Sequence, residues 1–301
     1  EWDPNLAKYN VGITAGIETD RCNPEWVTAI NRMSKVIVPS EHSARVLREA
    51  GAATTEIEVI PESFPDSLLS GDIKPLDIEL ENDFNFLIVG QFTGNTSATD
   101  RKNTAAAIVW LCQEFSKDEV GIVIKANMGR NTKIDRQVTE RALQSILAQC
   151  PENRPRVHLV HGYMNDEEMA GLYHHPKIKA YVTCTRGEGY GLPILEAAAC
   201  DLPVVATDWS GHLDFLNKGK FIKLAYQLID VDKRKIDGKL FMPGARWAEV
   251  IEPDFKKKVR KLRESYALPK EWASDLGKVL RESHSFEAIS KQYDEVLGEV
   301  L

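Results

Sequence analysis

The sequence lacks the cysteine pairs that mark a disulfide framework or a structural zinc site. It holds five cysteines, an odd number, and none of them forms a C-x-x-C pair. Disulfide scaffolds use even sets of cysteines, and zinc sites use closely spaced pairs. Cys184 and Cys200 stand in apolar runs and are expected in the core. This cysteine usage predicts a cytoplasmic protein.

Long apolar runs and an excess of basic residues are also missing. No stretch approaches the ~20 apolar residues that span a bilayer, and no signal peptide is visible. The formal net charge is −7, whereas a nucleic-acid-binding protein usually presents a basic face. The basic triplet 256–258 lies in a charged helical stretch and predicts a solvated helix face. The sequence therefore argues against a membrane span and against a nucleic-acid partner.

What the sequence does contain is an alternation of short apolar runs with helical patterns. This alternation is typical of βαβ units around a parallel sheet, and 301 residues suffice for two domains. Ser40 is suited to cap a helix of the first series. That series predicts strands at 11–14, 35–39 and 56–60, and helices that begin near Pro24 and at Glu41.

A second series follows a proline-containing, acidic linker at 61–83. Its predicted strands are 86–90, 121–125, 157–160, 180–183 and 203–207, and its predicted helices are 103–115, 133–149, 166–173 and 193–200. This pattern is typical of a doubly wound domain. Beyond Asp214 the pattern weakens, and 221–229 is consistent with an antiparallel strand or a meander. From Asp254 onward the chain is mostly amphipathic helix.

The predicted fold class is therefore α/β, with one complete Rossmann-like, doubly wound parallel-sheet domain and a partial second one. We expect residues 1–75 to form the partial N-terminal domain and residues 76–284 the complete domain. Residues 285–301 are expected to form a helix that packs back on the N-terminal part. Because the first series is short and the chain begins at Glu1, we expect a fragment of a longer protein.

The most informative segment is 186–196, which reads RGEGYGLPILE. It leaves a predicted strand and opens a helix. Its three glycines let the backbone approach a ligand closely, and Pro193 suits the first helical turn. The free N–H groups and the helix dipole form an anion site there. Glu188 and Glu196 flank the turn and suit a vicinal diol, so the segment fits a sugar nucleotide. The alternative is an exposed loop glutamate and an ordinary helix glutamate.

This segment resembles the Glu-x7-Glu motif of retaining GT-B glycosyltransferases of the group 1 type, and the match continues to Gly211 and His212. The resemblance implies two Rossmann-like domains facing a cleft, and transfer of a hexose from a UDP- or GDP-sugar to a sugar, lipid or protein acceptor. It implies that Glu188 contacts the transferred sugar and Glu196 the nucleotide ribose. Other donor-loop residues implied by the resemblance are Arg186, Gly187, Gly189, Tyr190, Gly191 and Leu192.

Positive charge for the leaving diphosphate is expected just before the first helix of the second series. Arg101 and Lys102 can stabilise such a group, and the resemblance implies that Lys102 binds the donor phosphates. With Glu188, they are the predicted catalytic residues. A solvated basic pair is the alternative, although cations oppose the dipole of a helix N-terminus. Donor-binding residues are also expected in the preceding loop, at Gly90, Gln91 and Phe92. Many relatives have an arginine at the place of Gln91, so either Arg101 supplies the second charge or phosphate stabilisation is weaker.

The base of the nucleotide is expected beside the loop at Tyr163 and Met164, by resemblance. The adjoining Asn165 and Glu168 also have the spacing of a capping box.

Candidate acceptor-side residues are Glu18 and Asp20, which face the same cleft if the two halves oppose each other. A capping or ion-pair role is the alternative. Relatives commonly place a histidine near this point, and none stands there. His42, His174 and His175 are interpreted as surface residues instead.

The sequence thus predicts a retaining, metal-independent transferase without a cofactor. The pair Asp230 and Asp232 is discounted as a metal site, because nearby acids are common in loops and such enzymes use protein cations. Two alternatives stay open: a sugar-nucleotide epimerase on the same fold, and a non-catalytic nucleotide-sugar-binding module. Peripheral membrane association and homo-oligomerisation also stay open.

Overall fold

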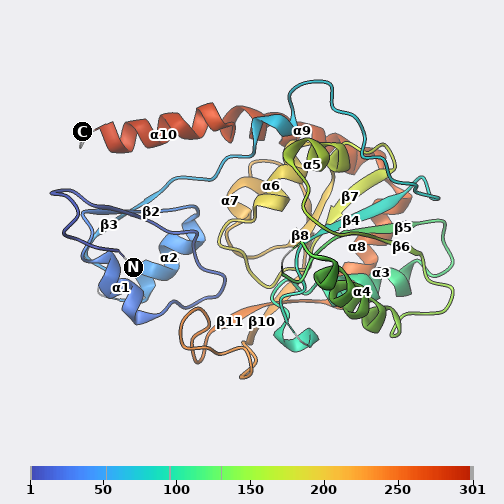
Figure 1. Cartoon of the computed structure of the whole chain (residues 1–301), viewed down its shortest axis with the longest axis horizontal. Coiled ribbons are helices and arrows are strands. Elements are labelled where there is room, and N and C mark those ends of the chain that lie inside the picture. The colour runs from blue at the N-terminus through green and yellow to red at the C-terminus, as the bar shows by residue number, and fades with distance from the viewer. Residues whose placement is uncertain (1, 52, 95, 130, 299–301) are drawn as a thin grey trace.

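The computed structural model describes residues 2–51, 53–94, 96–129 and 131–298, which form two α/β units that lie side by side (Figure 1). The smaller unit holds the first three strands, and the larger unit holds the remaining chain except the last helix, which runs back along the smaller unit. The predicted α/β class with parallel sheets is confirmed. Of the predicted domains, residues 1, 52, 95, 130 and 299–301 lie outside the described residues.

The smaller unit is a three-stranded parallel sheet with order β1-β2-β3. The central strand β2 is buried along its whole length because α1, α2 and the last helix cover the sheet. Ser40 caps α2 as predicted, since its Oγ accepts a hydrogen bond from the Ser43 backbone N–H at 3.2 Å. The elements are β1 Val11–Ile13, α1 Pro24–Ile30, β2 Lys35–Val38, α2 Glu41–Glu49 and β3 Glu56–Val59.

The larger unit is a six-stranded parallel sheet with order β6-β5-β4-β7-β8-β9. Strand order reverses between β4 and β7, and ligands of doubly wound sheets bind at this kind of switch point. The strands are β4 Asn85–Val89, β5 Gly121–Lys125, β6 Arg156–Val160, β7 Ile178–Val182, β8 Val204–Thr207 and β9 Ile222–Leu224. The helices between them are α3 Thr104–Glu114, α4 Lys133–Leu147, α5 Asp166–Tyr173, α6 Leu192–Ala199 and α7 Leu213–Leu216.

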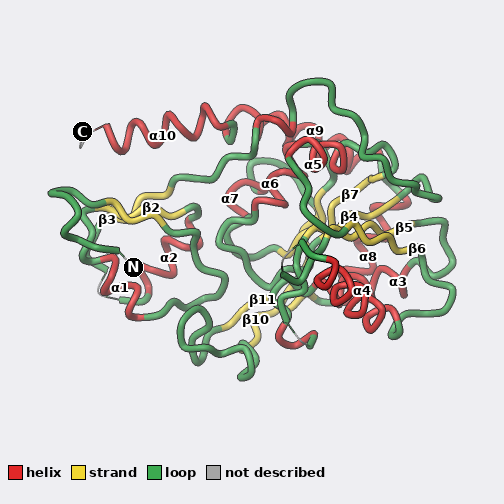
Figure 2. Tube along the Cα trace, viewed as in Figure 1, coloured by secondary structure: helices red, strands yellow, loops and turns green. Residues whose placement is uncertain are grey.

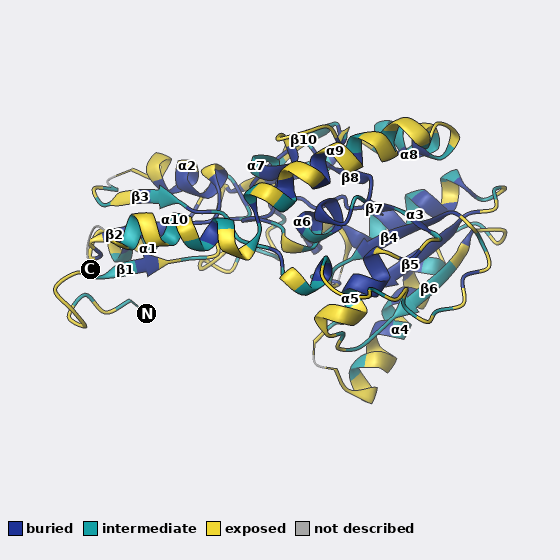
Figure 3. Ribbon diagram, turned by 90° about the horizontal axis from the view of Figure 1, so that it is seen from above, coloured by how far each residue is buried: buried dark blue, intermediate teal, exposed yellow. Residues whose placement is uncertain are grey.

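Helices cover both faces of this sheet (Figure 2). One apolar cluster packs α5, α6 and α9 on one face, and a second packs α3, α4 and α8 on the other. The buried strands between them appear as the dark centre of the larger unit in Figure 3. The remaining elements are the 3-10 turns η1 Asp66–Leu68 and η2 Ser97–Thr99, the strands β10 Tyr226–Asp230 and β11 Arg246–Val250, and the helices α8 Glu252–Glu264, α9 Ala267–Ser283 and α10 Phe286–Gly298.

The chain after α7 differs in part from the sequence prediction. Residues 221–229 were expected to form one antiparallel strand or a meander, but β9 is a sixth parallel strand beside β8. Only β10 is antiparallel, and its partner is β11. The two strands are separated by Ala225 alone, so sequence periodicity cannot divide them. Leu224 is fully buried, and this burial explains why β9 joins the main sheet.

Two segments tie the units together. The linker is irregular apart from η1 and lies on the larger unit, where Phe64 and Leu68 are buried. On α10, Ile289 packs against Ile37 and Ile60 of the smaller unit. Within the described residues, no helix is both long enough and apolar enough to cross a membrane.

The loops at the carboxyl ends of the two sheets meet in close backbone contact. Ser40 Oγ donates to the Gly189 carbonyl at 2.6 Å. A Cβ added at Gly187 would overlap the carbonyl oxygen of Glu18. Glycine is therefore required at this position by the approach of the other unit.

Replacing Gly187 by alanine is expected to lower the free energy of unfolding by about 1–3 kcal/mol, because the added methyl overpacks a backbone contact. Urea denaturation measures this change. Gly129→Ala is the matched control, since the nearest atom to its added Cβ lies at an ordinary 3.5 Å. Equal stability of the two variants would contradict the packing described here.

Candidate active site

The loop after β7 brings the predicted anion-binding turn to the switch point of the sheet. Gly191 precedes α6 with φ of 104°, a conformation that favours glycine. Pro193 lies in the first turn, as predicted. The backbone of Glu188 is fixed by the β8–α7 loop, because its N–H donates to Ser210 Oγ at 2.9 Å and its carbonyl accepts from the Gly211 N–H at 3.0 Å. His212 in turn bonds the Thr207 carbonyl through Nε2 at 2.7 Å.

The predicted catalytic residues converge on the Glu188 carboxylate. Lys102 Nζ lies 2.6 Å and 2.8 Å from its two oxygens, and Arg101 Nη1 lies 3.2 Å from one of them. Thr185 donates a further hydrogen bond at 2.8 Å. Burial raises the pKa of Glu188, but the charges of Lys102 and Arg101 outweigh it and lower the pKa to about 2. Glu188 is therefore ionised. A ligand that displaces its carboxylate would have the charges of Lys102 and Arg101 within reach.

Arg101 also links the two units. Its Nη1 donates to the Gly187 carbonyl at 2.7 Å, and its Nη2 lies 2.9 Å from Glu18 Oε1. Burial raises the pKa of Glu18, with the Arg101 charge opposing it. Glu18 thus reaches the cluster from the smaller unit. Asp20, the other candidate acceptor-side residue, pairs with Arg246 at 2.7 Å. Both acids occupy the ion-pair role that the sequence left open as an alternative.

Arg186 supports the turn from behind. Its guanidinium pairs with Glu249 at 2.5 Å and donates to the carbonyls of Ser97 and Asp100 at 2.6 Å and 2.7 Å. It also lies over the Trp247 ring at 5.1 Å. Because these contacts engage the guanidinium and leave it buried, the structure gives Arg186 a positioning role in the protein.

The loop after β4 lies beside this cluster. Gly90 packs near Lys102, Gln91 is exposed, and Phe92 is buried in the core. Asp100, which the sequence reasoning did not single out, organises the loop, because its carboxylate accepts from Thr93 Oγ1 at 2.6 Å and from the N–H of residue 104 at 2.9 Å.

Glu196 takes no part in the contacts that join Lys102 and Arg101 to Glu188, the group called here the Lys102 cluster. Its Oε2 accepts a hydrogen bond from Tyr173 Oη at 2.8 Å. Burial raises the pKa of Glu196 to about 7, although the Tyr173 hydrogen bond opposes this shift. The cavity beside Glu188 is small, about 10 Å³, and Glu196 does not line it. Burial is the main cause that raises the pKa of Tyr181, and the charges of Glu188 and Glu196 raise it further.

Glu196 is expected to make stability depend on pH. Since its folded pKa of about 7 lies above the ordinary value of 4.5, the native state binds more protons than the unfolded state between these values. Its contribution to stability therefore falls as pH rises from about 4.5 to about 7. Denaturant titrations of the wild type and of Glu196→Gln at several pH values measure this contribution. The free energy of unfolding of the variant is expected to fall less between pH 4.5 and 7 than that of the wild type. Identical pH profiles would contradict it.

The expected base-binding loop is largely open. Tyr163 is 76% exposed and Met164 is half-buried. Gly162 has φ of 112° and its carbonyl accepts from Lys125 Nζ. The capping box predicted from the spacing of the next residues is confirmed, since Asn165 caps α5 and forms a capping box with Glu168.

Two histidines were wrongly interpreted as surface residues. His42 and His175 are buried, whereas His174 is exposed as expected. His42 packs edge-on against Trp209 with ring centroids 5.1 Å apart. The spacing in the sequence could have predicted the burial of His42. It stands four residues before Val46, so both lie on the core face of α2.

Lys235 is a further cation that the sequence reasoning missed. It lies in the β10–β11 connection, and its Nζ donates to the Thr93 carbonyl at 3.1 Å. Its charge opposes, weakly, the burial that raises the pKa of Glu18. In the same connection, Asp232 pairs with Arg234 at 2.8 Å. Across the described ranges, no group of three or more histidine, cysteine or acidic side chains is arranged to hold a metal ion.

Residues 147–232, which include the whole turn and Glu196, match the family described as Glycosyl transferases group 1. A search of curated proteins finds no match.

Several solved structures have the same fold at low sequence identity. The sucrose-phosphate synthase of Thermosynechococcus elongatus matches with a TM-score of 0.63 and 16% identity, over 91% of this chain and 60% of that one. The pneumococcal O-GlcNAc transferase GtfA, solved with UDP and GlcNAc, matches with a TM-score of 0.63 and 13% identity, over 97% of this chain and 52% of that one. The HepE protein of Anabaena, solved with UDP and glucose, matches with a TM-score of 0.59 and 17% identity, over 92% and 66%. The chain therefore spans between about half and two thirds of the length of these proteins.

Proposed function

We propose that this chain takes part in sugar transfer from a nucleotide-diphosphate sugar. Residues 147–232 match the group 1 glycosyltransferase family, and the chain has the GT-B fold. In this proposal a hexose passes from a UDP- or GDP-sugar to an acceptor hydroxyl with retention at the anomeric carbon, without a metal ion. One observation carries the proposal: Lys102 and Arg101 converge on Glu188 beside the N-terminus of α6.

The donor diphosphate is proposed to lie between these cations and the turn before α6. Its negative charge takes the place of the Glu188 contact on Lys102, while the amides of 189–192 and the dipole of α6 bind phosphate oxygens. The carboxylate of Glu188 is then available to the hydroxyls of the transferred sugar. In the described conformation the cations are held by Glu188 and Glu18, so donor binding requires a local rearrangement of these side chains.

The reaction itself needs positioning and charge stabilisation. The bond from the anomeric carbon to the diphosphate breaks, the acceptor oxygen bonds to the same face of that carbon, and a donor phosphate oxygen takes the acceptor proton. Lys102 and Arg101 stabilise the charge that develops on the diphosphate. Glu196, in its carboxylate form, is proposed to accept hydrogen bonds from the ribose diol. Nucleotide affinity should therefore increase as the pH is raised through about 7.

A two-stage experiment tests the proposal. A thermal-shift panel of UDP-, GDP- and ADP-hexoses first identifies the donor, since a ligand of the folded state raises Tm. The preferred donor is then incubated with and without candidate acceptors, and the products are followed by NMR. Acceptor-dependent transfer that keeps the donor's anomeric configuration is expected. Epimerised sugar without any acceptor would assign an epimerase, and binding without turnover would assign a binding module.

A further inference from the structure

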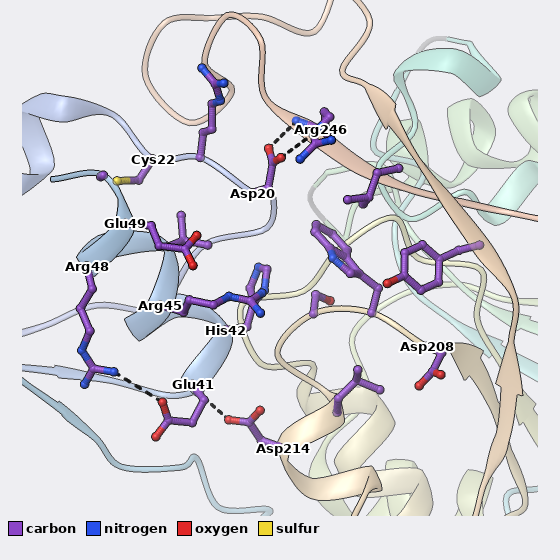
Figure 4. A pocket seen from close by; sticks show the side chains of 18 of the residues that line it. Asp20, Cys22, Glu41, His42, Arg45, Arg48, Glu49, Asp208, Asp214 and Arg246 are labelled. Carbon is purple, nitrogen blue, oxygen red and sulfur yellow. Dashed lines mark hydrogen bonds and ion pairs between the residues drawn. The ribbon is translucent and has the colours of Figure 1, made fainter.

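A large cavity lies between the two units, separate from the Lys102 cluster. Its volume is about 1350 Å³. Helix α2 forms one wall, and the β8–α7 loop with the β10–β11 strands forms the other (Figure 4). The polar and aromatic residues that line it include Asp20, His42, Arg45, Asp208, Trp209, Asp214, Tyr226 and Arg246.

The wall on α2 presents an oriented guanidinium. Arg45 Nη2 lies 3.2 Å from His42 Nδ1, and because arginine only donates hydrogen bonds, Nδ1 must be the acceptor. Burial, and after it the Arg45 charge, lower the pKa of His42 to about 4. The imidazole is therefore neutral at pH 7 and holds the exposed Arg45 side chain at the cavity wall.

The opposite wall presents carboxylates. Asp214 Oδ2 accepts from the Glu41 backbone N–H at 2.6 Å, and Asp208 pairs with Lys223 at 3.1 Å. In Figure 4, Asp208 lies across the cavity from α2, whereas Asp214 lies beside Glu41 at the start of that helix. The Asp20–Arg246 pair bridges the walls at the edge.

The chemistry of the lining selects the class of ligand. Four arginines and five acidic residues line the cavity, so it carries no net positive charge that would favour a phosphate or a polyanion. Guanidinium groups donate to hydroxyl oxygens, carboxylates accept from hydroxyl groups, and the aromatic residues Trp209 and Tyr226 add apolar surface. This combination suits an uncharged molecule with many hydroxyl groups.

The cavity adjoins the proposed reaction site. Ser210 lines it and accepts a hydrogen bond from the Glu188 N–H at 2.9 Å. Trp209 also lines it and lies against Gly187. The volume exceeds the roughly 300–1,000 Å³ of sites for drug-sized ligands, so there is room for more than one sugar ring.

We propose that this cavity binds the acceptor and that the acceptor is a neutral oligosaccharide. The inference rests on the proposed function, because it places the acceptor next to the turn that holds the donor. Arg45 and Asp208 are assigned to acceptor binding, and His42 is a positioning residue for Arg45.

A glycan array that carries neutral, uronate-containing, sialylated and sulfated oligosaccharides tests the inference, with the full chain as the probe. The wild type should retain neutral oligosaccharides. Arg45→Ala should weaken this retention about 10-fold, the effect of one lost hydrogen bond from a charged group. Arg45 is exposed, so the variant should fold. Arg32→Ala is the matched control, since Arg32 is an exposed arginine of the same unit that does not line the cavity.

The outcomes separate this inference from the proposed function. Retention of acidic glycans only, retention of no glycan, or equal effects of Arg45→Ala and Arg32→Ala would overturn the cavity assignment. Transfer activity with an acceptor KM unchanged in Arg45→Ala would do the same while leaving the proposed function standing. Neutral glycan binding that depends on Arg45, without any donor binding, would reject the proposed function and keep the cavity as a carbohydrate site.

Discussion

Replacing Lys102 by alanine is expected to lower the sugar-transfer rate about 100- to 1000-fold, because one preorganised charge at a developing anion is worth that much. Lys102 makes the shortest contact to Glu188, 2.6 Å, and is partly buried with it. Its loss also removes the largest favourable influence on the buried carboxylate, so the pKa of Glu188 should rise from about 2. The rate with a saturating donor measures the first effect.

Lys117→Ala is the control for this prediction, since Lys117 is an exposed lysine in the turn that follows α3. It should transfer sugar at the wild-type rate. A Lys102→Ala enzyme with an undiminished rate would mean that the Lys102–Glu188 pair is only structural.

Replacing Arg186 by alanine is expected to lower the free energy of unfolding by about 3 kcal/mol or more. Its guanidinium is buried, and removing one partner of a buried ion pair leaves the other charge uncompensated. The carbonyls of Ser97 and Asp100 also lose their donor. Equilibrium denaturation by urea measures this loss directly.

The matched control is Arg136→Ala, which removes one exposed arginine and its pair with Glu140 along α4. Such a pair contributes less than about 0.5 kcal/mol. A double-mutant cycle of Arg186 and Glu249 should show strong coupling. Additive effects in that cycle would contradict the buried-pair explanation.

The sequence predicted most of the fold because local signals agree with the tertiary structure. The eight strands it placed lie within two residues of β1 to β8, since these strands are short apolar runs bounded by loop residues. The caps at Ser40 and Asn165 were visible from side-chain type and spacing alone. Strand β9 was missed because its three residues adjoin β10 with no turn signal between them.

The candidate site was predictable only where its residues are neighbours in the chain. The turn at 186–196 and the pair Arg101–Lys102 carried recognisable patterns. The contacts of Arg101 with Glu18 and of His42 with Trp209 join residues from different units, and no local pattern encodes such contacts. The charge balance of the large cavity likewise depends on how the β10–β11 strands face α2.

The central claim is that the turn before α6 binds a nucleotide diphosphate. Amide hydrogen exchange with and without UDP, GDP and ADP tests it most directly. At least one of these nucleotides should slow the exchange of amides 187–192 and of the loop 90–92, and Glu196→Ala should weaken that protection. Protection of a different segment, or unchanged exchange in 187–192 with all three nucleotides, would contradict the account.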